Sequence, residues 1–413
     1  MSFDNINFSC INNFLNNNSK GNIVLSGLLS PFDLFLINFI KKTGKKILYI
    51  TPDEQSALKN QKDLENLLDI NSQVIPNQEI SFYSELEKNY YIYQEQINTL
   101  LTKPDVVFAP VKSLLEKFNN EDFYKNNIIN LKKGDTVDYS KIALDLVSMG
   151  YKRVTTVSDI GEFALRGDIL DIYALKANPY RIEFFADTIE DIRFFNPQSQ
   201  KSFKNIEQAQ ILPLYKFILN NENKQNFKNK ISKIKDENEF SSKIKEELIE
   251  KIEETDYFEG IEYYQNYFLE EDFSILDFLN DYVVIFKESS QIYSKYEYYD
   301  DFFNQNYKDA LSSNFKLPLE KLNHFSIDFF KEKIKKFKVF SIDNFLNDDY
   351  DKIIEFSMSL PPIFSSNIKD ISKFIKKSLN ENFKIHICTN FPSRLKEIFD
   401  EVEIFSDDIM YHP

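Results

Sequence analysis

Short apolar runs alternate with amphipathic stretches over the first part of the chain. Three of these runs, at residues 23–25, 47–50 and 106–109, have the length of buried strands, and helical periodicity follows each one. Pro31 suits a helix entry, where a missing N–H costs nothing, and Asp53 suits the positive end of the next helix. The pattern predicts an α/β fold with a parallel sheet.

The pattern changes after Phe118. A predicted helix at residues 139–149 is followed by strand-like runs at 169–174, 181–186 and 189–195, with turn residues between them. We therefore predict a separate α+β insert with an antiparallel sheet.

Helix and strand signals resume beyond the insert. A Lys-, Glu- and Asn-rich stretch at residues 221–255 is typical of a solvated pair of amphipathic helices. The Val- and Ile-containing run at 282–286 is typical of a strand buried on both faces of a parallel sheet, so it is expected to complete the first sheet. Residues 384–388 and 391–400 then read as a strand and a helix.

These patterns divide the 413-residue chain into three domains, as its length leads us to expect. The first is an α/β domain made of residues 1–119 and 213–336. The second is the insert, residues 120–212. The third is a small α/β domain, residues 337–413.

Composition narrows the choice of partner. The formal net charge of −15 opposes binding to a polyanion, although a local basic face stays open. Cys10 and Cys388 lie too far apart to indicate a disulfide framework or a zinc site, and both are interpreted as buried thiols. The first 19 residues are polar and Asn-rich rather than basic then apolar, which predicts a cytoplasmic protein.

The sequence carries no recognisable catalytic motif. The loop over residues 26–33 has one Gly, no Lys, and Asp33 where phosphate charge would lie, so it disfavours ATP binding. His324, His386 and His412 have no second ligand at metal-binding spacing. We therefore predict no catalytic, cofactor or metal site.

Arginine is rare but clustered. The chain has five Arg against 45 Lys, and four of the five, Arg153, Arg166, Arg181 and Arg193, fall within 41 residues. The guanidinium group binds carboxylates bidentately and stacks on aromatic rings, which the lysine ammonium cannot do. The clustering therefore indicates a requirement for that geometry.

Strand alternation then divides the residues around Arg181 between two faces. Ile182 and Phe184 lie on one face, and Arg181, Glu183 and Phe185 lie on the other. If the first face is core, Phe185 is exposed beside an arginine, as at many protein interfaces. An internal Arg181–Glu ion pair with Phe185 under a loop explains the pattern equally well.

Arg166 also has two interpretations, because it precedes a turn glycine. It can belong to the same binding surface as Arg181, or it can brace the turn with a hydrogen bond.

Three long segments carry a family resemblance: residues 161–172, 179–185 and 191–202. Together they resemble the signature shared by the excision-repair protein UvrB and the bacterial transcription-repair coupling factors (Mfd). Residues 50–58 and 260–265 resemble the amino-terminal half of the coupling factors.

The resemblance implies a UvrB-like domain that has lost its ATP site, interrupted by a smaller domain that binds the damage-recognition protein UvrA. By motif match, the family's UvrA-contacting residues fall on Arg166, Arg181 and Phe185. The family also implies that the ATP- and magnesium-dependent motor, the contacts with RNA polymerase and DNA, and a C-terminal domain that masks the UvrA site lie outside these residues.

Two other functions stay open at this stage. One is a nucleotide-dependent helicase domain like that of UvrB, which the 26–33 loop disfavours. The other is direct binding of damaged DNA by the insert, which would give steeply salt-dependent affinity.

Overall fold

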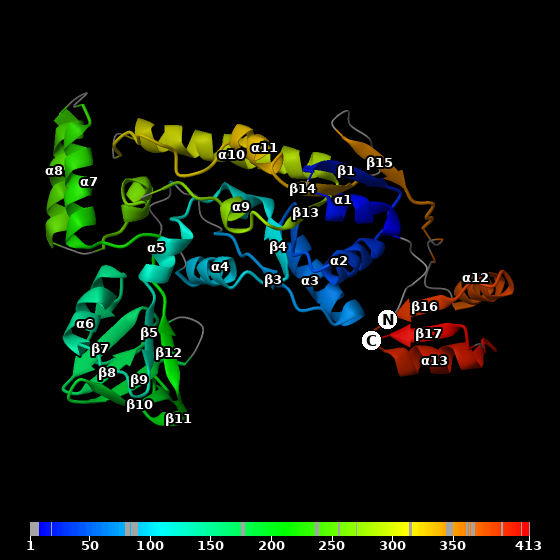
Figure 1. Cartoon of the computed structure of the whole chain (residues 1–413), viewed down its shortest axis with the longest axis horizontal. Helices are drawn as coiled ribbons and strands as arrows, with labels where there is room; N and C mark the ends of the chain where they lie inside the picture. Colours follow the sequence, from blue (N-terminus) through cyan, green and yellow to red (C-terminus); the bar gives the residue numbers. More distant parts are fainter. Residues whose placement is uncertain are drawn as a thin grey trace.

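The fold was analysed in a computed structural model of the whole chain (Figure 1). The structure describes residues 8–17, 19–78, 83, 90–174, 178–235, 239–254, 257–269, 271–313, 316–343, 350–360, 362, 364, 368–389, 391–405 and 407–412. The side chains of Cys388 and His412 lie outside this description. Cys10 is exposed, so the expectation that its thiol is buried was wrong.

A parallel sheet of seven strands forms the centre of the fold, which confirms the predicted α/β class. In spatial order its strands are β15 (Lys352–Glu355), β1 (Gly21–Ser26), β14 (Lys338–Ile342), β13 (Val283–Lys287), β2 (Ile47–Thr51), β4 (Val106–Pro110) and β3 (Gln73–Val74).

Helices cover both faces of this sheet, so its strands read as continuous apolar runs. In β2, Ile47 and Tyr49 join one core, whereas Leu48 and Ile50 join the other. The first core packs against α1 (Asn12–Asn16), α2 (Phe32–Lys42) and α3 (Glu54–Leu68). The second core includes side chains of α4 (Tyr90–Thr102), α9 (Ile275–Phe278), α10 (Ser289–Ser312) and α11 (Ile327–Ile334).

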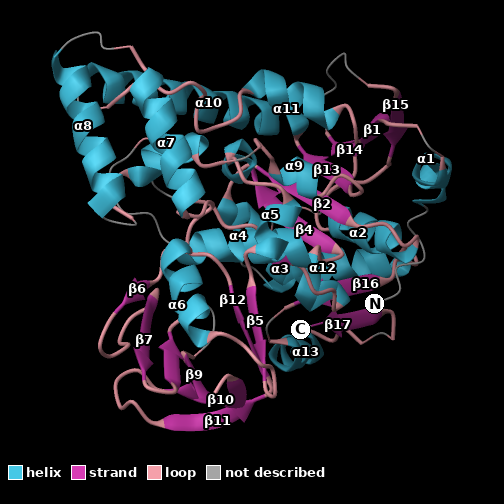
Figure 2. Cartoon of the chain, turned by 60° about the vertical axis from the view of Figure 1, so that its left-hand side comes forward, coloured by secondary structure: helices cyan, strands magenta, loops and turns pink. Residues whose placement is uncertain are grey.

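Helix starts follow the predicted cues. Asp53 is the N-cap of α3, and its side chain accepts a hydrogen bond from the Ser56 backbone N–H. Pro31 stands at the N-cap position of α2. The charged stretch after the insert forms the predicted helix pair, α7 (Asn221–Lys233) and α8 (Glu239–Glu254), which lie side by side in both views (Figures 1 and 2).

The second sheet belongs to the insert and is mainly antiparallel, as predicted. Helix α6 (Tyr139–Ser148) packs on it, and α5 (Glu121–Asn126) precedes it. Its six strands in spatial order are β11 (Ser202–Ile206), β10 (Thr188–Phe195), β9 (Tyr180–Phe185), β8 (Ile169–Ile172), β7 (Glu162–Arg166) and β6 (Lys152–Arg153). A separate pair, β5 (Ile129–Lys132) and β12 (Gln208–Ile211), joins the start of the insert to its end.

Buried polar contacts hold together the two chain segments that lead into and out of the insert. Lys216 forms an ion pair with Glu116, and its Nζ lies 3.9 Å from the ring centroid of Phe118. Gln94 Nε2 donates to the carbonyl oxygens of Leu212 and Pro213, at 3.0 and 3.1 Å. One apolar core runs without a break from α10 and α11 into the insert's sheet.

The predicted third domain differs from the observed structure at its start. Strands β14 and β15 were assigned to that domain, but both lie in the seven-stranded sheet on either side of β1 (Figure 1). Because parallel neighbours are paired across long stretches of chain, strand order could not be read from local patterns. Residues beyond them form α12 (Ile368–Asn380), β16 (Ile385–Cys388), α13 (Pro392–Glu401) and β17 (Ile409–His412), with β16 and β17 parallel.

In the described part of the chain, none of the helices has both the length and the apolar character needed to cross a bilayer.

Candidate protein-binding site

Strand β9 has one buried face and one polar face, as alternation predicted. Ile182 and Phe184 are buried in the core under α6. Arg181, Glu183 and Phe185 face the other way, and Phe185 is 76% exposed. An exposed aromatic ring on the same face as arginines has the composition typical of interface hot spots.

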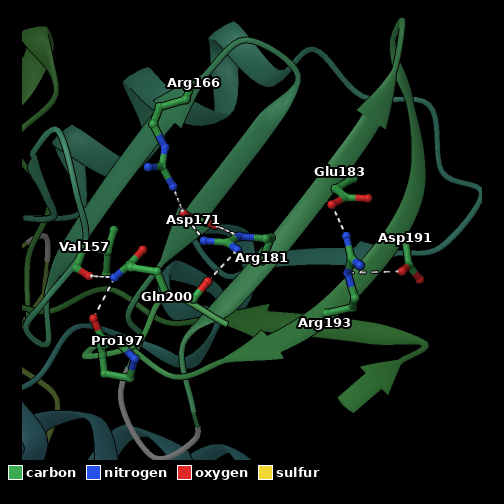
Figure 3. Close-up of polar contacts among 9 residues, drawn as sticks. All are labelled: Val157, Arg166, Asp171, Arg181, Glu183, Asp191, Arg193, Pro197 and Gln200. Carbon is green, nitrogen blue, oxygen red and sulfur yellow. Dashed lines mark hydrogen bonds and ion pairs between the residues drawn. The ribbon is translucent and has the colours of Figure 1, made fainter. Parts of the chain in front are cut away.

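Asp171 lies at the centre of this polar face. It is the residue opposite Arg181 on the neighbouring strand β8, and it is fully buried. Arg181 donates two hydrogen bonds to its carboxylate, from Nε to Oδ1 at 2.7 Å and from Nη2 to Oδ2 at 2.9 Å. Arg166, from the end of β7, donates to the same Oδ2 at 2.5 Å (Figure 3). One carboxylate therefore holds two guanidinium groups.

The Arg181 guanidinium has further contacts besides Asp171. Its Nη1 donates to the backbone carbonyl of Gln200 at 3.0 Å, and its guanidinium carbon lies 4.7 Å from the Phe195 ring centroid. The hydrogen bonds to Asp171 raise the pKa of Arg181 above its already high value. Only 14% of the Arg181 side chain is exposed, against 46% for Arg166. Arg166 is therefore the more accessible of the two cations.

The turn after β10 positions the Gln200 carbonyl. Gln200 adopts a φ of 58°, and its side-chain Nε2 donates to the carbonyl oxygens of Val157 and Pro197, at 2.9 and 2.6 Å (Figure 3). Asn196 Oδ1 accepts from the backbone N–H groups of residues 198 and 199, at 3.0 and 2.8 Å. These bonds fix the turn, so Gln200 supports Arg181 through its backbone.

A second ion-pair group lies further along the same face. Arg193 pairs with Glu183, and its Nε lies 3.3 Å from Asp191 Oδ2 (Figure 3). Glu183 is therefore the partner of Arg193 and not of Arg181. The alternative in which Arg181 pairs with a Glu and Phe185 lies under a loop was wrong on both counts, because Asp171 is the partner of Arg181 and Phe185 is exposed.

Sequence reasoning missed Asp171 and Gln200. A signal for Asp171 was present, since a carboxylate interrupts the apolar run of β8. Its pairing with Arg166 also differs from the turn-bracing bond considered for that residue, because Asp171 belongs to a neighbouring strand. Arg153 is exposed in β6 and lies outside this group of contacts.

The loop at the start of α2 was the place for a nucleotide phosphate in the helicase alternative. Asp33 is the last residue of this loop and is fully buried. Its Oδ2 accepts hydrogen bonds from the Tyr49 hydroxyl at 2.9 Å and from Lys287 Nζ at 3.1 Å. A carboxylate thus occupies the beginning of α2, which agrees with the expected unsuitability of this loop for phosphate.

Comparisons with known proteins give the site its context. A family model described as the UvrB interaction domain matches residues 129–217, which include Asp171 and its partners Arg166 and Arg181. Transcription-repair-coupling factors from Haemophilus influenzae and Borreliella burgdorferi are 26% and 33% identical over 262 and 239 residues, which is 62% and 54% of this chain. The chain is a homologue of the transcription-repair-coupling factors.

A Staphylococcus aureus relative of the same name is 30% identical over 209 residues, or 49% of this chain. The matches cover 23%, 20% and 18% of the three relatives, so this coupling-factor homologue spans about a fifth of their length. The predicted family is thereby confirmed.

Proposed function

We propose that this coupling-factor homologue binds UvrA through the polar face of the insert, with Phe185 as the apolar anchor and Arg166 and Arg181 as the flanking cations. One observation carries the proposal: an exposed phenylalanine lies on the same sheet face as two guanidiniums that a buried Asp171 holds in place, inside the segment matched by the UvrB interaction domain. Binding energy at interfaces concentrates in such aromatic and arginine residues.

In this proposal the two arginines differ in their contribution. Arg166 has the exposed surface needed to meet a partner directly. Arg181 is largely covered, so it contributes mainly by fixing Asp171 and the turn at Gln200. A group held rigid before binding loses little conformational entropy on association, which favours affinity.

We further propose that the role of this binding is to recruit UvrA to RNA polymerase halted at DNA damage. In this view the described residues perform no catalysis and need no ATP or magnesium. Contacts with RNA polymerase and DNA, translocation, and masking of the UvrA site belong to other parts of a full-length coupling factor. The buried Asp33 beside Lys287 supports this view over the helicase alternative. The cytoplasmic location stays a prediction.

Phe185→Ala tests the proposal by titration of purified UvrA against the chain. Because Phe185 is exposed, its removal should leave the unfolding midpoint unchanged while weakening binding by about 2 kcal/mol, roughly 30-fold in Kd. Phe203→Ala is the matched control. Phe203 is 56% exposed in β11 of the same sheet and stacks on Phe194, which alternates away from the face of Arg193.

Binding curves that coincide for the wild type and Phe185→Ala would refute the assignment, as would equal losses in Phe185→Ala and Phe203→Ala. Arg166→Ala should also weaken binding, with Arg394→Ala as its control, because Arg394 is an exposed arginine on α13.

A further inference from the structure

Among the described residues, three α-helices directly follow strands at the carboxyl edge of the seven-stranded sheet: α2 after β1, α3 after β2, and α10 after β13. In parallel α/β sheets ligands bind at this edge, and helix N-termini attract anions. Each of the three N-termini here has a carboxylate from the chain. Asp53 caps α3, and Asp343 accepts from the backbone N–H and the hydroxyl of Ser289 at the start of α10, both at 2.7 Å.

Asp33, in the first turn of α2, differs from the other two carboxylates. Asp53 and Asp343 accept from backbone N–H groups, as helix caps do. Asp33 accepts instead from two side chains of other strands, the Tyr49 hydroxyl of β2 and Lys287 Nζ at the end of β13. Its second oxygen, Oδ1, is buried and has no hydrogen-bond partner among the described residues.

This donor set is one that would hold a free oxyanion. An ammonium group and a phenolic hydroxyl converge on one carboxylate oxygen in the first turn of α2. Burial, followed by the nearby Asp33 charge, raises the pKa of Tyr49, so its hydroxyl stays a donor at neutral pH. Burial of a carboxylate oxygen without a hydrogen-bond partner destabilises the fold, which a carboxylate placed only for stability would avoid.

We propose that Lys287 and Tyr49 form a carboxylate-binding site that the chain fills with its own Asp33. Asp33 is tethered one turn into the helix, so its local concentration at the site exceeds that of any dissolved anion. A phosphate or carboxylate ligand would have to displace it. At the start of α2, Asp33 thus occupies the place on the sheet edge where an anionic ligand would bind.

Chemical rescue tests the proposal, with formate as the probe because it is the carboxylate that Asp33→Ala removes. Thermal unfolding of the full chain is followed in sodium formate and in sodium chloride at equal ionic strength. Formate should raise the Tm of Asp33→Ala saturably, by roughly 2 °C or more over chloride. It should act on the wild type no differently from chloride, and adding Lys287→Met to Asp33→Ala should abolish the rise.

Equal effects of formate on the wild type and Asp33→Ala would overturn the proposal, and so would a full rise in the variant that also carries Lys287→Met. If Asp33→Ala fails to fold in chloride, folding restored by formate supports the site, whereas failure in both salts refutes it. The outcome does not depend on UvrA binding.

Discussion

Replacing Asp171 with asparagine isolates the charge that holds the two arginines. Asparagine has the same shape, so the perturbation is confined to one negative charge and one acceptor oxygen. Arg181 donates to both oxygens of Asp171, and Arg166 shares one of them. The variant therefore turns at least one of three charge-assisted bonds into a contact between two donors.

The size of the loss follows from burial. Asp171 is fully buried and Arg181 is 14% exposed, so breaking their pair resembles the loss of one partner of a buried ion pair, about 3–5 kcal/mol. Arg166 is nearly half exposed, and its share is reduced by solvent screening to below about 1 kcal/mol. We expect Asp171→Asn to lose about 3 kcal/mol of unfolding free energy, a large part of the total stability of a domain.

Urea denaturation of the full chain measures this loss, and titration with UvrA measures its effect on the site. Asp168→Asn is the matched control, because Asp168 is exposed in the turn between β7 and β8. Asp171→Asn should weaken UvrA binding even where the protein is folded, since Arg166 loses its fixed position. A change in unfolding free energy below about 1 kcal/mol, or one equal to that of Asp168→Asn, would show that Asp171 does not organise this face.

Two further predictions concern buried groups of the first domain and its junction with the insert. Burial lowers the pKa of His324 to about 4 despite the opposing charge of Asp300. The fold thus prefers neutral imidazole, so stability should be full above the unfolded pKa of about 6.5 and decline as pH falls toward 4, by at most about 3 kcal/mol. Urea midpoints between pH 7 and pH 4 check this, and the His324→Gln variant should lack that part of the decline. Lys216→Met should lose about 3–5 kcal/mol because it leaves Glu116 buried without its cation. Adding Glu116→Gln should restore most of the urea midpoint, and equal midpoints for the single and double variants would contradict this account.

The sequence was most informative about which side chains of one strand are buried and which are exposed. Alternation alone separated Ile182 and Phe184 from Phe185, because side chains on a strand must point to opposite faces. The same reasoning could not find Asp171 as the partner of Arg181. That contact depends on the register between β8 and β9, and residues 175–177, which lie between these strands, are outside the described part of the chain.

Long-range pairing accounts for the other differences. Strands β14 and β15 flank β1 although more than 300 residues separate them in sequence, so the sheet extends beyond residue 337. The acidic character of Asp33 was evident from its loop. Its partner Lys287 was not, because the two residues lie 254 positions apart and meet only when the sheet is assembled.

The junction between the insert and the first domain has a mechanical consequence. Two chain crossings join them, and these are clamped by the Glu116–Lys216 pair and by Gln94 over a continuous apolar core. The insert therefore has little freedom to swivel. A partner bound at Phe185 would therefore keep a fixed orientation relative to α10 and the seven-stranded sheet. A displacement of the partner would move the first domain with it.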